Sequence, residues 1–560
     1  KNLMPEATTL AYAREMDARD PLRHFRDRFF IPQHNGQESL YLCGNSLGLQ
    51  PKTAEAALKH ELEHWKTHGV EGHFRGDLPW MDYHKFLTEQ SAHVVGAMPE
   101  EVVVMNTLTT NLHLMMVSFY RPDANRFKII MEAGAFPSDQ YAVESQVKWH
   151  GFSPEEAIVE VQPRPGEDTL RTEDIIATIE EHGAQTALVL FGGVNYFTGQ
   201  LFDMQAITET AHRAGAYAGF DLAHAAGNAH LKLHDWGADF AVWCSYKYLN
   251  SGPGGPSGAF VHERHGNNPD LPRFAGWWGH DENERFLMRK GFHPMPGAAG
   301  WQLSNAQIFS FAVHKASLDI FYEATMPALR QKSEQLTGYL EKLLQGLPAG
   351  RFRIITPADP AARGCQLSIY TEQGGKKLFD TLSEQGVIAD WREDNLSGKQ
   401  LPPGPDPDFI KPGGQIIGAG VTAGAGIGTA ACYILPECFI HYIYRCVDQF
   451  SALGLHPDDQ RAYLEVMHHL PGGTAVKGDV PYRIQFPCPI DLQPFKSNVV
   501  RARVYFHDFS AAVSTGVGNR LAEVCRINPG NPIGEFAIDC CRHTYFGGVK
   551  ADRPVQLLLG

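Results

Sequence analysis

The sequence predicts an α/β fold with three parts: a large domain on a mostly parallel β-sheet, a smaller α+β domain and an atypical C-terminal extension. First, short apolar runs alternate with helical patterns from about residue 126 onward, as in sheets covered on both faces. Second, residues 300–395 change to two long helical patterns followed by short strands. Third, the composition shifts abruptly toward Cys, Gly and Pro after residue 395.

The bulk composition limits the classes of protein to consider. A chain of 560 residues is too long for one ordinary domain, and 43% hydrophobic with 20% charged residues is typical of globular proteins. The net charge of −14 argues against a nucleic-acid partner, because phosphate binding needs clustered Lys and Arg. The polar start, Lys1–Glu6, has no apolar core. We therefore expect no signal peptide, no membrane partner and a cytoplasmic location.

The first hundred residues contain a glycine-broken apolar run, Tyr41–Leu49, and then an amphipathic helical pattern, Ala54–His68. Ser46 and His73 lie on either side of that helix. From the residue pattern alone, a turn serine and a surface histidine are the simpler interpretation.

A second strand-to-helix unit begins at Val102, where a short strand and a threonine-rich turn precede an apolar helix. Thr109 or Thr110 is the expected N-cap residue. The free N–H groups of a helix N-terminus favour phosphate binding, although most threonine caps serve only the helix.

The alternating region supplies the central sheet. The expected strands are Phe127–Met131, Ala187–Phe191, Tyr217–Leu222, Phe240–Ser245 and Gly258–His262. The expected helices between them are Ser138–His150, Thr172–His182 and Met204–Ala214. Ligands of such sheets bind beyond the carboxyl ends of the strands. Asp221 and Lys247 both follow strand ends, so we expect them at one edge.

Lys247 and Asp221 have the chemistry that pyridoxal phosphate (PLP) requires. An apolar strand leads to Lys247, which a glycine-rich turn follows, and another strand leads to Asp221. A lysine amine forms the Schiff base with this cofactor, and a carboxylate pairs with the pyridinium nitrogen.

The smaller domain is predicted from five elements: helices Asn305–Met326, Pro327–Leu347 and Lys376–Gln385, and strands Gln366–Tyr370 and Val387–Trp391. We divide the chain into residues 1–45 as an N-terminal segment, 46–300 as the large domain and 301–395 as the small domain. Residues 396–497 form an unrecognised insert, and 498–560 form a remnant of the small domain with a tail.

The ten cysteines are unevenly distributed, with three before residue 396 and seven after it. The first part therefore resembles a reduced cytosolic enzyme. No spacing gives a CxxC pair, so we expect no zinc site and no other metal.

An ordered series of motifs resembles the kynureninase family over residues 10–395. These motifs are Gly44–Pro51, Met105–Thr109, Phe136–Ala142, Gly219–Ala225, Trp243–Asn250, Gly276–His280 and Ser304–Asn305. The resemblance implies a fold-type I PLP-dependent enzyme. It also implies hydrolytic Cβ–Cγ cleavage of L-kynurenine or 3-hydroxy-L-kynurenine to anthranilate or 3-hydroxyanthranilate and L-alanine. Such enzymes act in tryptophan catabolism and NAD biosynthesis.

The resemblance also implies roles for single residues. Lys247 binds PLP and moves protons, Asp221 pairs with the pyridine nitrogen, and His224 lies beside the ring. Phosphate and ring contacts are implied for Leu108, Thr109, Phe136, Pro137, Ser138, Asp139 and Tyr246. Tyr246 is also expected to relay protons near neutrality. Trp277 and Asn305 are expected to close the site from the partner of a homodimer. Ser46, His73 and Asn305 are implied on the substrate side, which reverses the simpler interpretation of the first two.

Two departures from the family pattern stand out. Gly192 occupies a position where the family often has a serine, which costs one hydrogen bond, of order 1 kcal/mol. After Asn395 the family pattern continues with an arginine-bearing strand and a proline-rich loop. That strand reappears at Asn498–Ala502 without the loop, so Arg501 is the candidate that binds the substrate carboxylate.

Residues 396–560 allow three interpretations. Gly418–Ala423 matches a dinucleotide-binding fingerprint with Glu437 downstream, but a full strand does not precede it. The uncharged run Ile416–Leu435 resembles a membrane span, but its many glycines make it poorly hydrophobic. The favoured interpretation is a loosely structured insert or a gene-model error.

Two other functions stay open from the sequence. One is a chain that binds PLP but has impaired catalysis because the tail alters the carboxylate site. The other is an aminotransferase or desulfurase of the same fold, which is disfavoured because Cys365 lies in an apolar strand pattern.

Overall fold

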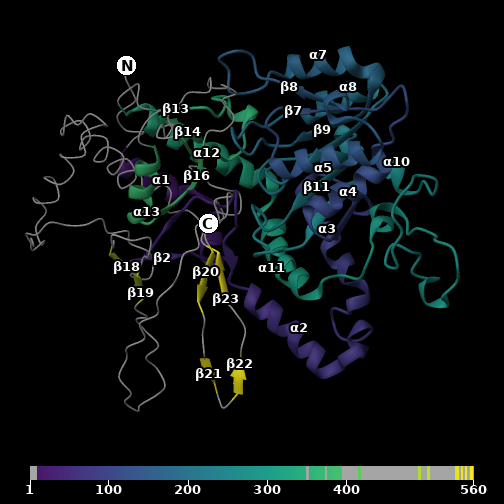
Figure 1. Ribbon diagram of the computed structural model, residues 1–560, viewed down its shortest axis with the longest axis horizontal. Helices are drawn as coiled ribbons and strands as arrows, with labels where there is room; N and C mark the ends of the chain where they lie inside the picture. Colours follow the sequence, from purple (N-terminus) through teal and green to yellow (C-terminus); the bar gives the residue numbers. More distant parts are fainter. Residues whose placement is uncertain are drawn as a thin grey trace, which may run out of the picture. The chain divides into compact units, whose positions relative to one another are not determined.

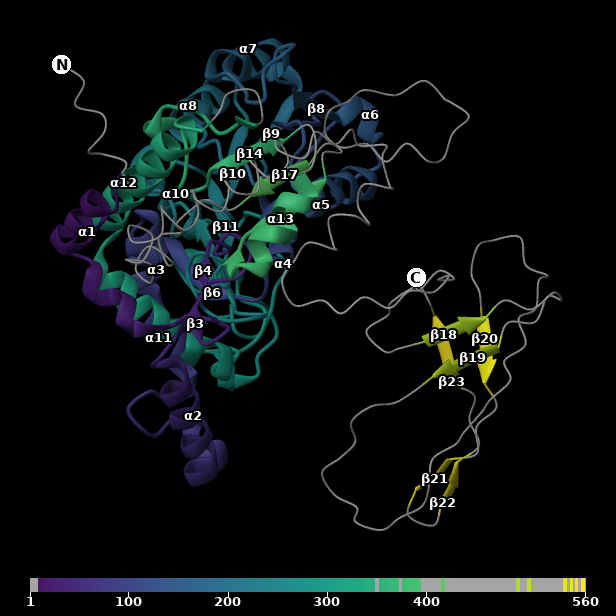
Figure 2. The ribbon, with the colours of Figure 1, turned by 90° about the vertical axis from the view of Figure 1, so that its left-hand side faces the viewer.

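The computed structural model describes residues 9–347, 352–371 and 375–393, and after them the short strands β17 to β23. The chain divides into two compact units, Lys1–Gly454 and Leu455–Gly560. Figures 1 and 2 show the elements of both units with their labels, and each unit is described by itself.

The first unit is built on a seven-stranded sheet with the order β6-β12-β11-β10-β9-β7-β8 (Figure 1). Strand β12 runs antiparallel to both of its neighbours, whereas the other pairs are parallel. The strands are β6 (Val102–Met105), β7 (Lys128–Glu132), β8 (Ile158–Val161), β9 (Thr186–Gly192), β10 (Tyr217–Asp221), β11 (Phe240–Cys244) and β12 (Ser257–Val261). This architecture confirms the predicted α/β class.

Alternate residues of each strand enter separate hydrophobic cores on the two faces of the sheet. In β9, Val189 and Phe191 join one core and Leu188 and Leu190 join the other. The first core includes helices α3 (Thr88–Val95), α7 (Thr172–His182), α8 (Met204–Arg213) and α11 (Ile308–Ala324). The second includes α4 (Leu108–Phe119) and α5 (Pro137–Trp149). Because both faces are covered, the strands are apolar along their whole length.

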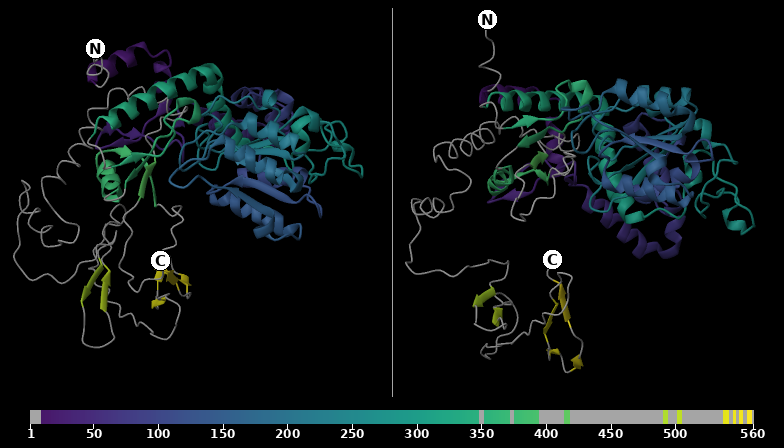
Figure 3. Two further views of the ribbon diagram at one scale, coloured as in Figure 1. Left: turned by 90° about the horizontal axis from the view of Figure 1, so that it is seen from above. Right: turned by 45° about the horizontal axis from the view of Figure 1, so that its top comes forward.

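Three further long helices surround this layer. Helix α1 (Leu10–Arg19) packs Ala13 against Leu336 and Leu343 of α12 (Met326–Gln345), and Figure 3 shows the purple and green helices side by side. Helix α2 (Ala54–His68) contacts α11 and projects from the unit in Figures 1 and 2.

A smaller four-stranded sheet has the order β13-β14-β17-β16. Its strands are β13 (Arg353–Ile354), β14 (Ser368–Thr371), β16 (Asp390–Glu393) and β17 (Gly414–Ile417), and helix α13 (Gly375–Glu384) packs beside them. Strand β17 comes from the segment interpreted as an insert and pairs with both β14 and β16. Strand β15 (Val387–Ile388) pairs in parallel with β4 (Leu40–Tyr41), near the start of the chain.

The described residues require three local corrections. The N-cap of α4 is Thr107, not Thr109 or Thr110, because Thr107 is extended and Leu108 already begins the helix. The expected helix Asn305–Met326 ends at Ala324, because Thr325 has φ 65° and separates α11 from α12. The expected strand Val387–Trp391 is divided between β15 and β16.

The remaining elements are short. In the first unit the remaining short α-helices and strands are α6 (Pro154–Ala157), α9 (Leu233–Trp236), α10 (Glu263–Gly266), β1 (Phe29–Phe30), β2 (Gln33–His34), β3 (Gln37–Glu38) and β5 (Gln50–Pro51), and short 3-10 helices lie between the elements. The second unit has three antiparallel pairs: β18 (Ile490–Gln493) with β19 (Arg501–Val504), β20 (Ala537–Cys540) with β23 (Val555–Leu558), and β21 (Thr544–Phe546) with β22 (Val549–Ala551). Among the described residues, no helix has the length and apolar character needed to cross a membrane. The described residues do not include Glu437, Gly418–Ala423 or most of Ile416–Leu435.

Candidate active site

Asp221 and Lys247 lie at one edge of the large sheet, as the sequence predicts. Asp221 is the last residue of β10, and Lys247 follows the last residue of β11, Cys244, in the adjacent turn. The two strands are parallel neighbours, with Asp221 in register with Val242. Both side chains are almost fully buried, with exposed fractions of 5% and 9%.

The amine of Lys247 is held by His224. Its Nζ lies 2.9 Å from His224 Nε2, and the histidine is 5% exposed. Burial, with the charges of Lys247 and Arg392, lowers the pKa of His224 well below its usual value. The imidazole is therefore neutral and accepts a hydrogen bond from the lysine at Nε2.

Asp221 has one buried oxygen that no backbone group reaches. Its Oδ1 accepts the N–H of Ala223 at 2.8 Å, whereas no N–H group of the described residues donates to Oδ2, and the carboxyl group of Asp139 is the side chain that bonds Asp221. A buried carboxylate oxygen in this state is costly, because it has lost water without gaining an N–H donor. A pyridinium N–H would satisfy it, so this oxygen fits the cofactor that the sequence predicts.

Two helix starts meet beside the lysine turn. Thr109 lies in the first turn of α4 and Ser138 in the first turn of α5, and their hydroxyl oxygens are 2.9 Å apart. Leu108 is the first residue of α4, and Pro137 is the first residue of α5. Hydroxyls and free N–H groups from two helix N-termini form a setting that suits a phosphate.

The Phe136–Asp139 segment also lies next to Lys247. Lys247 Nζ lies 5.6 Å from the centre of the Phe136 ring. Burial, together with the nearby carboxyl groups of Asp221 and Glu132, raises the pKa of Asp139 well above its usual value. Because Asp221 and Asp139 lie side by side, a neutral Asp139 leaves Asp221 as the charged partner for a cation.

The phenol of Tyr246 differs from the expectation. It is half-buried, and burial with the thiol of Cys244 beside it raises its pKa above the usual value. It therefore does not titrate near neutrality in the chain alone. The burial of Tyr246, which the sequence pattern does not reveal, keeps its phenol neutral.

The Gly44–Pro51 motif packs against the lysine turn. The N–H of Gly48 donates to the carbonyl oxygen of Tyr246 at 2.8 Å, and Asn250 Nδ2 donates to the Leu49 carbonyl at 2.9 Å. A Cβ on Gly48 would lie 2.3 Å from the carbonyl oxygen of Lys247, so only glycine fits there. Ser46 belongs to this segment and is exposed.

Four residues that were predicted to belong to the site show no contact with Lys247 within the described part of the chain. His73 is half-buried, and its Nδ1 is 2.9 Å from the carbonyl oxygen of Val70. Trp277 is 50% exposed beside the buried Trp278, and Asn305 is exposed as well. The backbone of Arg501 begins β19 in the second unit, but its side chain lies outside the described residues. Their roles stay predictions.

Three residues near the Lys247–His224 pair, namely Glu132, Tyr196 and Arg392, were not predicted from the sequence. Glu132 ends β7 and is 4% exposed. Both of its carboxylate oxygens face the N–H of Gly192, at 3.0 and 3.1 Å. A Cβ on Gly192 would lie 2.8 Å from Glu132 Oε1, so a larger residue at this position would have to displace the carboxylate of Glu132. The sequence feature that could have identified Glu132 is an acidic residue at the end of the apolar strand next to β9.

The raised pKa of Glu132 predicts how the stability of the folded chain changes with pH. Burial, the first cause, raises its pKa to about 7 from an ordinary value of 4.5. Between these values the folded chain holds a proton that the unfolded chain has released, so the free energy of unfolding falls as pH rises and is level above about pH 7. For Glu132→Gln we expect this slope to disappear, a difference of about 3 kcal/mol between pH 4 and pH 8. Urea unfolding of cofactor-free protein across this range measures it.

The matched control for this experiment is Asp17→Asn. Burial also raises the pKa of Asp17 to about 7, so this variant should lose a similar slope far from Lys247. If wild type and Glu132→Gln keep parallel curves, Glu132 does not hold a proton in the folded chain.

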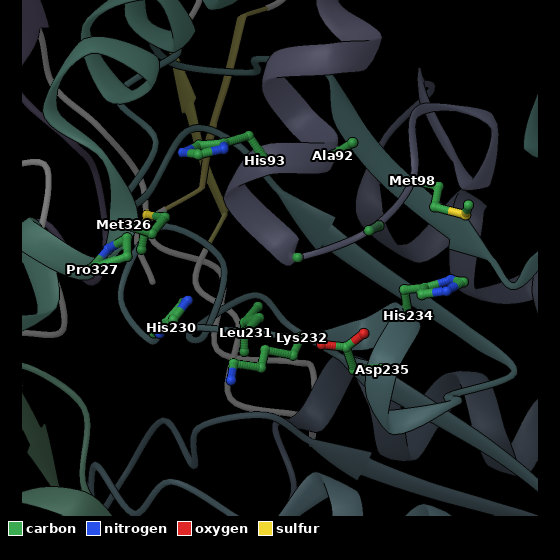
Figure 4. Close-up of a pocket in the computed structure, with 12 residues that line it drawn as sticks. Ala92, His93, Met98, His230, Leu231, Lys232, His234, Asp235, Met326 and Pro327 are labelled. Carbon is green, nitrogen blue, oxygen red and sulfur yellow. The ribbon is translucent and has the colours of Figure 1, made fainter.

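A separate pocket lies between α3, α9 and the start of α12, and Figure 4 shows its lining. Its volume is about 410 Å³, and none of the predicted site residues lines it.

Next to this pocket, Glu101, His234 and His262 bring ligand-type atoms within 4.8 Å of one another. Glu101 already accepts the N–H groups of Met98 and Glu263 and a hydrogen bond from His234. These hydrogen bonds of Glu101 fasten three segments of the chain to one another.

Comparison with known proteins identifies the family. Residues 329–397 match the kynureninase C-terminal domain. The chain is 58% identical over 390 residues to a kynureninase of Koribacter versatilis, covering 70% of this chain and 92% of that protein. It is also 58% identical over 387 residues to a kynureninase of Myxococcus xanthus, covering 69% and 91%. The chain belongs to the kynureninase family.

Solved structures place this kynureninase-family chain in a wider fold group. A cysteine desulfurase of Escherichia coli matches with a TM-score of 0.59 at 14% identity, covering 76% of this chain and 98% of that chain. The lyase C-DES, solved with glycine covalently linked to its PLP cofactor, matches with a TM-score of 0.57 at 14% identity, covering 72% and 96%. These likenesses confirm the fold-type I architecture. Cys365, which could have suggested a desulfurase, is fully buried.

Proposed function

We propose that this chain is a PLP-dependent kynureninase. It cleaves the Cβ–Cγ bond of L-kynurenine or 3-hydroxy-L-kynurenine with water, and releases L-alanine and anthranilate or its 3-hydroxy form. The observation that carries the proposal is the buried Oδ2 of Asp221, to which no N–H group of the described residues donates, beside the Lys247–His224 pair, in a chain 58% identical to a kynureninase. Bound PLP supplies an electron sink for the substrate Cα.

Several residues of the chain support this chemistry, each in a different way. Asp221 offers a negative oxygen to the ring nitrogen and so favours its protonated form. His224 is neutral and packs beside the lysine without adding charge. Thr109 and Ser138 offer hydroxyls to the phosphate. The amine of Lys247 takes up and returns protons at the substrate carbon, and the neutral phenol of Tyr246 is a second proton donor.

The assembly proposed for the enzyme is a cytoplasmic homodimer with shared active sites. Two sets of large apolar side chains support it because they are exposed in the single chain. Leu62 and Trp65 lie on α2, with exposed fractions of 46% and 57%. The other set is Phe274, Trp277, Phe286, Leu287 and Met288. A partner that covers the second set brings Trp277 and Asn305 to an active site.

The alternative, a PLP-binding chain without catalysis, is not favoured. The relatives named kynureninase align over 92% and 91% of their own lengths with this chain, so the match includes nearly all of a working enzyme.

A steady-state assay with both substrates tests the proposal. Purified chain loaded with PLP should release one L-alanine for each anthranilate or 3-hydroxyanthranilate, and the ratio of the two kcat/KM values gives the preferred substrate. A chain that binds PLP and forms neither aromatic product would support the non-catalytic alternative.

A further inference from the structure

A cavity of about 480 Å³ lies in the groove between helices α1 and α12, which Figure 3 shows side by side. It shares no lining residue with the pocket of Figure 4 or with the candidate active site. One stripe of each helix lines the cavity, together with two residues of a later segment. The lining residues are Tyr12, Met16, Glu334, Gln335, Gly338, Tyr339, Glu341, Lys342, Gln345, Pro360 and Arg363. The volume is that of a site for a small molecule.

The guanidinium of Arg363 is buried at this cavity, and only part of it is hydrogen-bonded. The residue is 1% exposed. Its Nη1 donates to Oε2 of Glu341 at 2.8 Å and to the carbonyl oxygen of Pro357 at 3.1 Å. Its Nε and Nη2 are buried, and within the described part of the chain neither has an acceptor. Buried donors in this state are costly, and these two nitrogens form the edge of a guanidinium that binds both oxygens of a carboxylate.

The acidic residues that line the cavity are already paired with arginines. Glu341 accepts the hydrogen bond from Arg363, and Glu334 lies 2.9 Å from Nε of Arg330. Lys342 is exposed, and no carboxylate of the described residues forms an ion pair with it. The open donors at the cavity therefore belong to two cations, Arg363 and Lys342. This arrangement is complementary to an anion.

The rest of the lining suits a flat apolar body. The ring centres of Tyr12 and Tyr339 are 5.8 Å apart, and Met16 packs against the same small core. Gly338 lies in the interior of α12, where glycine is unfavourable. Among the described residues, only the backbone of the helix itself comes within 4 Å of the place that a Cβ on Gly338 would occupy. The glycine therefore leaves open space at the cavity, beside aromatic rings that can pack against another ring.

We propose that the groove between α1 and α12 binds a small aromatic carboxylate. Its two oxygens bond the Nε and Nη2 edge of Arg363, Lys342 adds positive charge, and its ring occupies the space over Gly338. A carboxylate fits better than a phosphate, because the free edge of a guanidinium is planar and the remaining lining is largely aromatic and apolar. The site is separate from the proposed reaction, since it uses no residue of the candidate active site.

Binding of benzoate and of benzamide tests the proposal, because the two probes share a ring and differ in the carboxylate. Each is titrated into the PLP-loaded full chain, and ligand-observed NMR gives the dissociation constant. Benzoate should bind with a dissociation constant of about 1 mM or lower, and benzamide should bind at least about 10-fold more weakly because it lacks the charge. Inorganic phosphate, which has no ring, should not displace benzoate.

Two variants locate the site. Gly338→Leu fills the space over α12, so benzoate should bind at least about 10-fold more weakly, while Tm should not fall because Leu favours a helix more than glycine does. Lys342→Gln should weaken benzoate by about 3- to 10-fold and leave benzamide unchanged. The matched control is Lys148→Gln on α5, which lies outside the groove and should bind both probes like wild type.

Four outcomes would overturn the proposal: no binding of benzoate to wild type, equal binding of the two probes, displacement of benzoate by phosphate, or wild-type benzoate binding by folded Gly338→Leu. If Gly338→Leu does not fold, Lys342→Gln decides the result, and wild-type benzoate binding by that variant refutes the site. The titrations need no turnover. A chain that binds benzoate in the groove but does not cleave kynurenine would therefore refute the proposed reaction alone.

Discussion

Lys247→Ala is expected to lower kcat by at least about 10³-fold, because the same amine attaches the cofactor and moves protons at the substrate carbon. The cofactor should still bind, since Asp221 and the paired helix starts at Thr109 and Ser138 are unchanged. It should then leave the protein on denaturation, because no covalent link holds it. Borohydride treatment of PLP-loaded wild type followed by peptide mass analysis should place the label on Lys247, and the variant should carry none there.

The matched control is Lys232→Ala, which removes a lysine from the separate pocket shown in Figure 4. It should keep wild-type activity and wild-type labelling. A label that persists in Lys247→Ala, or one found on another lysine in wild type, would remove the basis of the proposed mechanism.

Asp221→Asn is expected to change stability in opposite directions in the two forms of the protein. Without cofactor the variant should be more stable, because burial disfavours the charged carboxylate of Asp221 and raises its pKa. With cofactor it should bind PLP about 10- to 100-fold more weakly, since a charged acceptor opposite the ring nitrogen has become neutral. Activity should fall by about 10²-fold or more, because the ring is then less often protonated.

Thermal unfolding with and without PLP, together with a PLP titration, measures both effects. Asp139→Asn is the comparison variant, because Asp139 is the neighbouring carboxyl group whose raised pKa indicates a neutral form. It should change PLP affinity much less than Asp221→Asn. Equal effects of the two variants would show that charge on Asp221 is not what the cofactor requires.

The sequence was most informative where local patterns decide the structure. Apolar runs of strand length located β7 and β9 to β12 within about one residue, because strands buried on both faces have few other solutions. The same runs located Asp221 and Lys247, because ligand sites in parallel sheets follow strand ends.

Residues that reach the site through tertiary contacts were harder to predict. Arg392 lies in an ordinary polar strand end, and its place beside Tyr196 depends on how the small sheet packs. Glu132 ends an apolar strand, as Asp221 does, but its partner is a backbone N–H of a neighbouring strand, which the sequence does not identify. The high pKa of Tyr246 depends on its burial and on the position of its phenol beside the thiol of Cys244, and the motif Trp243–Asn250 specifies neither.

The pairing of β4 with β15 gives the active site a mechanical connection to the smaller sheet. Strand β4 is hydrogen-bonded to β15. A turn begins two residues after β4, and Gly48 of this turn donates its N–H to the carbonyl oxygen of Tyr246. A tilt of the smaller sheet would move β15 and β4 with it and displace the backbone beside the reactive amine. The position of that amine is thereby coupled to the smaller sheet through a few hydrogen-bonded peptide units.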